Sequence, residues 1–201
     1  MTFQELNKLL ASPETPTVGE PLASLIQAGF NHFAATAFEA FILRVFEALD
    51  LHGSLTPPTG DEGADIILQD PSGVIIVQCK KYDTDTKVGS KELREFLGAM
   101  LHAKAIHGYY VSTSSFTDQA KSFCADHHEI TLIDADQLKR LVLISIVVSF
   151  QKLGRMHIPP LKDEQAELGP EFQIQAEGLY KEYLRELEKI KETARRSKPR
   201  R

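Results

Sequence analysis

Apolar residues and their spacing in the stretch from Gly60 to Tyr82 predict two short strands joined by a turn at Asp70-Pro71-Ser72-Gly73. Proline suits the second position of such a turn and glycine the fourth. Successive side chains on a strand point to opposite faces, so the second strand divides into two sets. One face carries Ile76, Gln78 and Lys80, and the other carries Ile75, Val77 and Cys79. An apolar strand therefore ends with an amide and an ammonium on the same face.

Apolar positions with helical spacing flank this hairpin on both sides. A stripe within 32–50 repeats at i, i+3, i+4 and i+7, and Ser90 can cap another helix. The stripe expected to be buried in that second helix consists of Leu93, Phe96, Leu97, Met100 and Leu101. Further helices are predicted at 2–10, at 117–127 and after the capping box of Asp134 and Gln137, and further strands at 51–56, 109–112 and 130–133. This order predicts an α/β sandwich in which helices cover both faces of a mixed sheet.

Segments of a different character precede and follow this core. Residues 1–30 contain a proline-rich connection and are predicted to form a peripheral helical extension. Residues 144–201 are predicted to form a helical C-terminal extension with a basic tail. Within it, apolar residues over 172–194 follow a short heptad spacing, which favours packing against the body of the protein, against a second copy or against a partner protein. The central domain is expected to span 31–143.

Composition narrows the class of protein. The 201 residues are 42% hydrophobic and 25% charged, as in ordinary soluble globular proteins. The formal net charge is −5, so the composition as a whole gives no sign of nucleic-acid binding. Cys79 and Cys124 are too few for a disulfide scaffold or a zinc site and indicate a reducing compartment. The first residues do not resemble a signal peptide, and the apolar run Leu141 to Phe150 is too short to span a membrane, so we expect a cytoplasmic protein without membrane contact.

Asp65 lies immediately before the apolar residues of the first hairpin strand. If strand pairing places its carboxylate beside Gln78 and Lys80, a cation site with a neighbouring ammonium results. Such a site can activate a water molecule against a phosphodiester. Two structural alternatives exist: Asp65 can accept hydrogen bonds in a turn, and Lys80 can be a charged residue that protects an edge strand.

Five sequence blocks carry a resemblance to a known family. They are Phe38-Glu39, Gly60 to Asp65, Gln78-Cys79-Lys80, Gly98-Ala99-Met100 and Ser112 to Thr117. In this order they resemble the Mrr-type branch of the PD-(D/E)XK restriction endonuclease superfamily, over roughly residues 33 to 143. The resemblance implies a three-layer α/β/α sandwich of the restriction-endonuclease type and an Mrr-like nuclease domain at 31–143.

The resemblance also implies roles for individual residues. Asp65 would be a ligand of a divalent cation, with Gln78 where many members of the superfamily carry an acid. Glu39 would supply a further carboxylate, although its place at the border of a helical stripe also suits an ordinary boundary residue. The backbone carbonyl of Cys79 would face the same cation. Mg²⁺ suits these oxygen ligands, with Mn²⁺ as a substitute, and Lys80 would act on the attacking water and on the developing charge.

Candidates for contact with DNA surround these residues in the sequence. The basic candidates are Lys81, Lys87, Lys91 and Arg94, and the hydroxyl-bearing candidates are Ser112, Thr113 and Ser115. Solvated surface is the alternative for each basic residue, and capping of the next helix is the alternative for the hydroxyl groups.

The function predicted from these features is a Mg²⁺-dependent endonuclease that hydrolyses double-stranded DNA in restriction or defence against phage. Two alternatives remain open at this stage. One is a DNA-binding or assembly subunit of a multi-protein defence complex, suggested by the net acidity and by the amphipathic 172–194 segment. The other is a structure-selective junction resolvase, which shares the catalytic geometry.

Overall fold

The structure is a computed structural model, and the chain divides into two compact units, Met1–Arg155 and Met156–Arg201. The described residues are 1–11, 30, 34–57, 63–83 and 85–153, with side chains to 142 and at 144 and 145. All of them belong to the first unit. The heptad spacing over 172–194 and the basic tail predicted from the sequence lie outside the described residues.

A five-stranded mixed sheet forms the centre of this unit, in the order β1-β2-β3-β5-β7. The pairs β1·β2 and β2·β3 are antiparallel, whereas β3·β5 and β5·β7 are parallel. The strands are β1 (His52–Leu55), β2 (Ile66–Asp70), β3 (Gly73–Lys80), β5 (His107–Ser112) and β7 (Ile130–Ile133). A separate pair of two-residue strands, β4 (Lys87–Val88) and β6 (Ser115–Phe116), was not predicted from the sequence.

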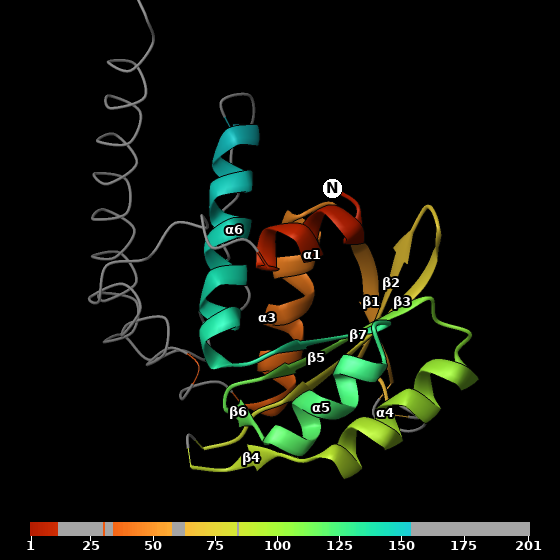
Figure 1. Ribbon diagram of the computed structural model, residues 1–201. Helices are drawn as coiled ribbons and strands as arrows, with labels where there is room; N and C mark the ends of the chain where they lie inside the picture. The colour runs from red at the N-terminus through yellow and green to blue at the C-terminus, as the bar shows by residue number, and fades with distance from the viewer. Residues whose placement is uncertain (12–29, 31–33, 58–62, 84, 154–201) are drawn as a thin grey trace, which may run out of the picture. The chain divides into compact units, whose positions relative to one another are not determined.

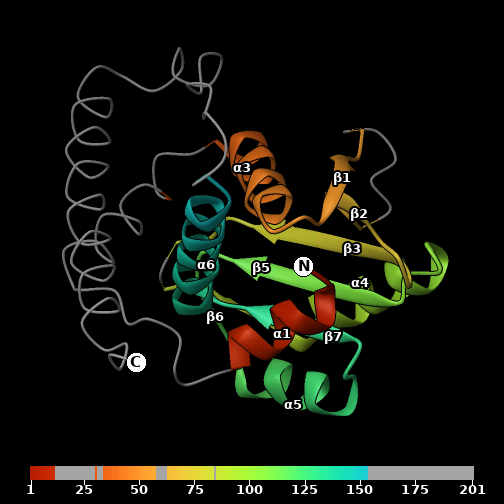
Figure 2. The same cartoon turned by 90° about the horizontal axis from the view of Figure 1, so that it is seen from above.

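Helices cover both faces of the sheet, which confirms the predicted three-layer α/β/α arrangement. One layer contains α1 (Phe3–Ala11), α3 (Ala35–Ala48) and α6 (Ala135–Leu153), and the opposite layer contains α4 (Ser90–His102) and α5 (Asp118–Asp126). Figure 1 shows the sheet between the two layers. Figure 2 looks down on the layer of α1, α3 and α6, with α4 and α5 behind the sheet.

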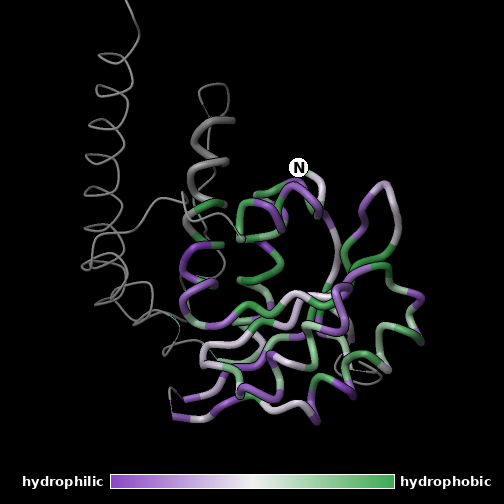
Figure 3. The backbone as a smooth tube through the Cα atoms, viewed as in Figure 1, coloured by the Kyte–Doolittle hydropathy of each residue, from purple (hydrophilic) through white to green (hydrophobic). Residues whose placement is uncertain are grey.

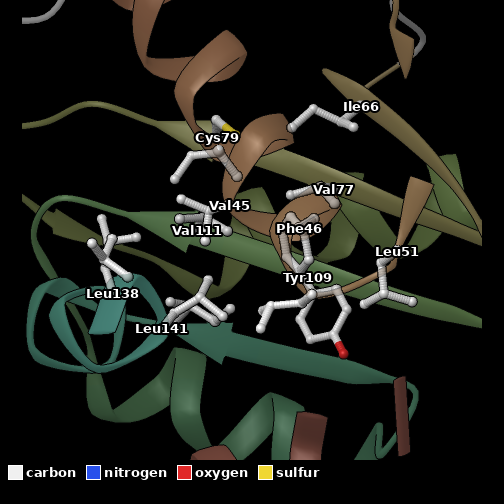
Figure 4. Packing of buried hydrophobic residues seen from close by; sticks show 14 of the residues in the cluster. Val45, Phe46, Leu51, Ile66, Val77, Cys79, Tyr109, Val111, Leu138 and Leu141 are labelled. Atoms are coloured by element: carbon white, nitrogen blue, oxygen red, sulfur yellow. The ribbon is translucent and has the colours of Figure 1, made fainter. Parts of the chain in front are cut away.

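The predicted alternation along β3 is confirmed by the two hydrophobic clusters of the core. Ile75, Val77 and Cys79 lie in the cluster shared with α3 and α6, whereas Ile76 lies in the cluster shared with α4 and α5. Figure 4 shows the first cluster, in which side chains from β3 and β5 meet Val45 and Phe46 of α3. Figure 3 colours the same backbone by hydropathy; the middle of β3, Val74 to Val77, is hydrophobic throughout, as expected of a strand covered on both faces. Because both faces are covered, β5 is buried along its whole length.

The tight turn between β2 and β3 follows the predicted chemistry. Asp70 pairs directly with Gly73, and the Oδ1 atom of Asp70 accepts a hydrogen bond of 2.9 Å from the backbone N–H of Ser72. Gly73 has φ of 149°, a value that side chains disfavour. A Cβ atom there would also lie 2.9 Å from Ile106 Cγ2. Glycine at this position therefore satisfies both the backbone conformation and the close packing.

The cap predicted for α6 is confirmed, whereas the cap predicted for α4 is wrong, because Gly89 is the N-cap and Ser90 is the first residue of the helix. Asp134 Oδ1 accepts from the backbone N–H of Gln137 at 2.9 Å and Thr117 Oγ1 accepts from that of Ala120 at 3.2 Å. On α4, however, Leu101 is 73% exposed, so its predicted burial is wrong. Ala99 is buried instead, because the face that packs on the sheet is rotated toward it.

α1 contributes to the core rather than lying at the periphery as predicted. Its Leu6 and Leu10 are buried in the cluster shared with α3 and α6. The predicted boundary at 143 falls inside α6, which continues to Leu153. Across the part of the chain that the structure describes, no helix has the length and apolar character needed to cross a membrane.

A buried polar cluster fixes α1 against the start of β5. His107 Nε2 lies 3.2 Å from Asn7 Nδ2 and 3.0 Å from Thr131 Oγ1, and the Tyr109 hydroxyl donates to Asn7 Oδ1 at 2.9 Å. The Phe3 ring stacks on His107 with centroids 5.0 Å apart. An amide nitrogen can only donate, so Nε2 is the acceptor and the imidazole is neutral. Burial lowers the pKa of His107 to about 4, against a smaller opposing effect of Glu129.

Candidate active site at the end of strand β3

Strand pairing brings Asp65 beside Gln78. The register Ile66↔Val77 places Asp65 opposite Gln78 one step further along, and the backbone N–H of Asp65 donates to the carbonyl of Val77 at 2.9 Å. The Oδ2 atom of Asp65 accepts from Gln78 Nε2 at 2.6 Å and from the backbone N–H of Cys79, also at 2.6 Å. The carboxylate is therefore held at the carboxyl end of β3.

The segment before Asp65 is fixed by close contact with α4 and β1. Gly63 has φ of 85°, and a Cβ atom there would lie 3.1 Å from the Cβ of Ala99. Thr56 donates its hydroxyl to the carbonyl of Ala64 at 2.6 Å and its backbone N–H to the carbonyl of Asp65 at 2.9 Å. Two of the five sequence blocks, those containing Gly63 and Ala99, therefore meet to support the carboxylate.

Charged groups from three elements converge on Cys79. Burial raises the pKa of its thiol well above the ordinary value, the carboxylates of Asp65 and Glu39 raise it further, and the Lys80 ammonium lowers it. Glu39 of α3, Asp65 before β2 and Lys80 of β3 are therefore all within electrostatic range of the Cys79 thiol. Glu39 and Lys80 are half-buried, and Gln78 is only 6% exposed. Of the four predicted catalytic residues, Asp65 and Gln78 are in direct contact, and Glu39 and Lys80 act electrostatically on the neighbouring Cys79.

The oxygen atoms available here suit a hard divalent cation. They belong to two carboxylates, an amide and the backbone, which is the ligand chemistry that Mg²⁺ prefers. Within the described residues, no group of three or more His, Cys, Asp or Glu side chains is arranged to hold a metal ion. A cation here would therefore depend on Gln78, on the Cys79 carbonyl and on water in addition to Asp65 and Glu39.

The basic candidates for DNA contact lie on the surface after β3. Lys81 is exposed where the strand ends, and Lys87 is exposed on β4, in register with the half-exposed Ser115 of β6. Lys91 and Arg94 are exposed on the first turns of α4. Lys91 lies 3.8 Å from Glu95 across the surface, and Arg94 donates to the hydroxyl of Ser90 at 3.2 Å.

The other two hydroxyl candidates are used inside the protein. Ser112 is 0% exposed and its hydroxyl lies 3.0 Å from that of Ser114. Thr113 is 2% exposed, and its hydroxyl bonds to the backbone of Tyr82. Burial argues against a phosphate contact for either residue, because neither hydroxyl reaches the surface. The link between Thr113 and Tyr82 had no signal in the sequence beyond a hydroxyl residue directly after a strand.

Comparisons with known proteins show the family of the chain and agree with its fold. The family model described as the Mrr catalytic domain, a restriction endonuclease, matches residues 30–142, more than half of the chain. The chain belongs to this family. It is also 30% identical over 146 residues to the type IV methyl-directed restriction enzyme EcoKMrr of Escherichia coli strain K12, which covers 69% of this chain and 46% of that protein.

Two further similarities concern more distant proteins. An uncharacterised protein, y4cE, of Sinorhizobium fredii strain NBRC 101917 / NGR234 is 31% identical over 94 residues, or 45% of this chain and 24% of that protein. The MspJI restriction endonuclease in complex with a 27-mer oligonucleotide is similar in fold, with a TM-score of 0.52 at 21% identity over 72% of this chain and 36% of that one. The chain thus spans less than half the length of the curated relatives it matches.

Proposed function

We propose that this chain is a Mg²⁺-dependent endonuclease that hydrolyses phosphodiester bonds of double-stranded DNA. The observation that carries the proposal is the Asp65 carboxylate bound to Gln78 and to the Cys79 N–H, with Lys80 one residue beyond. Membership of a restriction endonuclease family supports this choice over other uses of a carboxylate and a lysine. Membership of this family also supports a role in the restriction of foreign DNA in the cytoplasm.

Each site residue has a defined part in the proposed reaction. Asp65, Glu39, the amide oxygen of Gln78 and the carbonyl of Cys79 would hold the cation. A bound Mg²⁺, or Mn²⁺ in its place, would supply positive charge next to the phosphate and would make a coordinated water more acidic. The Lys80 ammonium donates to the phosphate oxygen on which negative charge develops. The attacking water gives up a proton to solvent as its oxygen bonds to phosphorus, one P–O ester bond breaks, and the departing oxygen takes up a proton from solvent.

The exposed basic residues position the DNA in this proposal. Lys81, Lys87, Lys91 and Arg94 contact phosphates, and Ser115, paired with Lys87 in register, adds a hydroxyl donor. Such contacts fix the register of a duplex without reading its sequence. Sensitivity to base modification is a further possibility to test, because the E. coli relative is described as methyl-directed.

Cleavage of plasmid DNA tests the proposal. Purified protein is incubated with Mg²⁺ and with plasmid from methylating and from non-methylating hosts, and nicked and linear products are measured on gels. Asp65→Asn and Lys80→Ala should each lower cleavage at least 100-fold, as should chelation of the metal. Lys121→Ala, which removes an exposed lysine from α5, is the matched control and should cleave like the wild type. Cleavage that survives both site substitutions contradicts the proposal.

The net charge of the chain supports a second candidate function, that of a nuclease subunit active only in a larger assembly. The formal charge of −5 is unfavourable for binding DNA alone, and a partner protein would then supply part of the DNA contact. Light scattering of the purified protein gives its oligomeric state, and cleavage is measured on the same sample. A monomer that cleaves alone removes the need for a partner or for a homo-oligomer through 172–194.

A further inference from the structure

The ladder between β3 and β5 ends in an unusual way next to the candidate site. The parallel register reaches Lys80↔Ser112, and the backbone N–H of Thr113 donates to the carbonyl of Lys80 at 3.1 Å. In a regular parallel ladder the next bond would run from the N–H of Tyr82 to the carbonyl of Thr113. Instead, the N–H of Tyr82 donates to the Thr113 hydroxyl at 2.9 Å. A side chain thus takes the place of its own backbone carbonyl.

The same hydroxyl also donates to the carbonyl of Tyr82 at 2.7 Å. Both backbone groups of Tyr82 therefore bond to one buried oxygen atom, and Thr113 is only 2% exposed. Loss of the hydroxyl would leave both backbone groups of Tyr82 without this partner. β5 can turn away toward β6 while Tyr82, two residues past the last regular pair of β3, stays bonded to Thr113.

A second contact holds Tyr82 from the side of α4. Its hydroxyl donates to Glu92 Oε1 at 2.8 Å, and this bond, followed by burial, raises the pKa of the phenol. The other carboxylate oxygen, Oε2, accepts from the backbone N–H of Gly89 at 2.8 Å at the start of α4. Tyr82 is thus fixed between the end of β5 and the first turn of α4.

Lys80 lies between two fixed points of the backbone. On one side the N–H of Cys79 donates to Asp65, and on the other Tyr82 is held by Thr113. We propose that Thr113 is a positioning residue: its hydroxyl extends β3 beyond its last regular pair and so holds the Lys80 ammonium in place against Asp65 and Gln78. This inference rests on the proposed function of Lys80 in phosphodiester hydrolysis. Small misplacement of a catalytic group is enough to lower the rate about 100-fold.

Three variants separate positioning from a general effect on folding. Thr113→Val removes the hydroxyl and keeps the shape of the side chain. Thr113→Ser keeps the hydroxyl. Ser114→Ala is the matched control, because Ser114 is equally buried in the same loop but its hydroxyl contacts Ser112 and the carbonyl of Ser115 rather than Tyr82.

Steady-state cleavage and amide hydrogen exchange are measured for all three, well below their melting temperatures. Thr113→Val should lower kcat by roughly 10- to 100-fold, with KM for DNA and the Mg²⁺ requirement changed less than about twofold. Protection of the Tyr82 amide should fall in the same variant. Thr113→Ser should restore kcat to within about threefold, and Ser114→Ala should keep both the wild-type kcat and the protection of Tyr82. An unchanged kcat in folded Thr113→Val, or a rise in KM alone, overturns the positioning role.

A further readout distinguishes failure of this inference from failure of the proposed nuclease. If the wild-type protein cleaves no DNA, the proposed function fails, and the position of Lys80 is then followed by NMR of ¹³C-dimethylated lysines, with Lys80→Arg to assign the signal. Thr113→Val should shift or broaden the Lys80 signal, and Ser114→Ala should not. A Lys80 signal that Thr113→Val leaves unchanged overturns the positioning role, whatever the activity of the protein.

Discussion

The stability of the protein should depend on the charge of His107. Its imidazole is 3% exposed and accepts a hydrogen bond from the Asn7 amide through Nε2. Protonation of Nε2 would turn this contact into two donors facing each other and would place a charge in the core. Burial accordingly lowers the folded pKa to about 4, whereas histidine in an unfolded chain has a pKa near 6.5. Folding thus excludes a proton that the unfolded chain binds.

The size of the effect follows from these two values. Because the folded pKa is the lower one, the stabilisation is fully present above about pH 6.5 and is lost as the pH falls through about 4. At pH 5 the free energy of unfolding should be lower than at pH 8 by about 2 kcal/mol from this residue. The limit below pH 4 is about 3 kcal/mol, since one pKa unit corresponds to about 1.4 kcal/mol.

Urea denaturation followed by circular dichroism measures the free energy of unfolding at pH 8, 6.5, 5.5 and 5. Circular dichroism is chosen because the chain contains no tryptophan. Other groups also titrate in this range, so the wild type is compared with His107→Gln, which keeps an acceptor oxygen and cannot be protonated. The matched control, His128→Gln, removes an exposed imidazole from the turn before β7.

His107→Gln should show a shallower loss of stability between pH 8 and pH 5, by about 2 kcal/mol relative to the wild type. The variant is expected to be less stable than the wild type at pH 8, because the stacking of Phe3 on the imidazole is lost. Parallel curves for the two proteins would refute the reasoning, since His107 would then have the same pKa in the folded and unfolded states.

Three further predictions concern stability. Gly53→Ala should destabilise the protein by about 1–3 kcal/mol or more in urea denaturation, because a Cβ atom would collide with the backbone carbonyl of Ile67; an unchanged midpoint would contradict the β1·β2 register. Asp134→Ala should cost about 1 kcal/mol of unfolding free energy through loss of the cap on α6, and Asp134→Ser should recover most of it. Leu101→Lys should change the free energy of unfolding by less than about 0.5 kcal/mol, whereas Leu93→Ala should lower it by about 2–5 kcal/mol, and equal losses would contradict the exposure of Leu101 and the burial of Leu93.

Local patterns in the sequence predicted most of the fold, because the features concerned depend on neighbouring residues. The alternation along β3 predicted Cys79 and Ile76 on opposite faces, as the core clusters confirm. The capping box of Asp134 and Gln137 fixed the start of α6 for the same reason. Such signals need no knowledge of which elements pack together.

The errors and omissions arose where tertiary packing decides. The spacing of apolar residues on a helix does not determine which side of the apolar face packs on the sheet. The sequence therefore predicts burial of Leu101, whereas Ala99 is the buried residue. Strands of two residues such as β4 and β6 are too short for any periodic signal. The hydroxyl of Thr113 was considered for DNA contact because its partner, Tyr82, lies 31 residues away in the sequence.

The position of the candidate site at the end of β3 follows from a limit that the sheet itself imposes. Side chains of one strand alternate between two covered faces, so Gln78 and a residue of α3 such as Glu39 approach from opposite sides. They can act on one cation only where the strands end and a group can pass around the edge. Asp65 lies at such an end, one residue before β2. Its carboxylate accepts hydrogen bonds from Gln78 and from the backbone N–H of Cys79, close to the last residue of β3. Groups from both sides of the sheet can therefore reach one cation at this end of β3. The two hydrogen bonds between the Thr113 hydroxyl and the backbone of Tyr82 then hold the chain that follows Lys80.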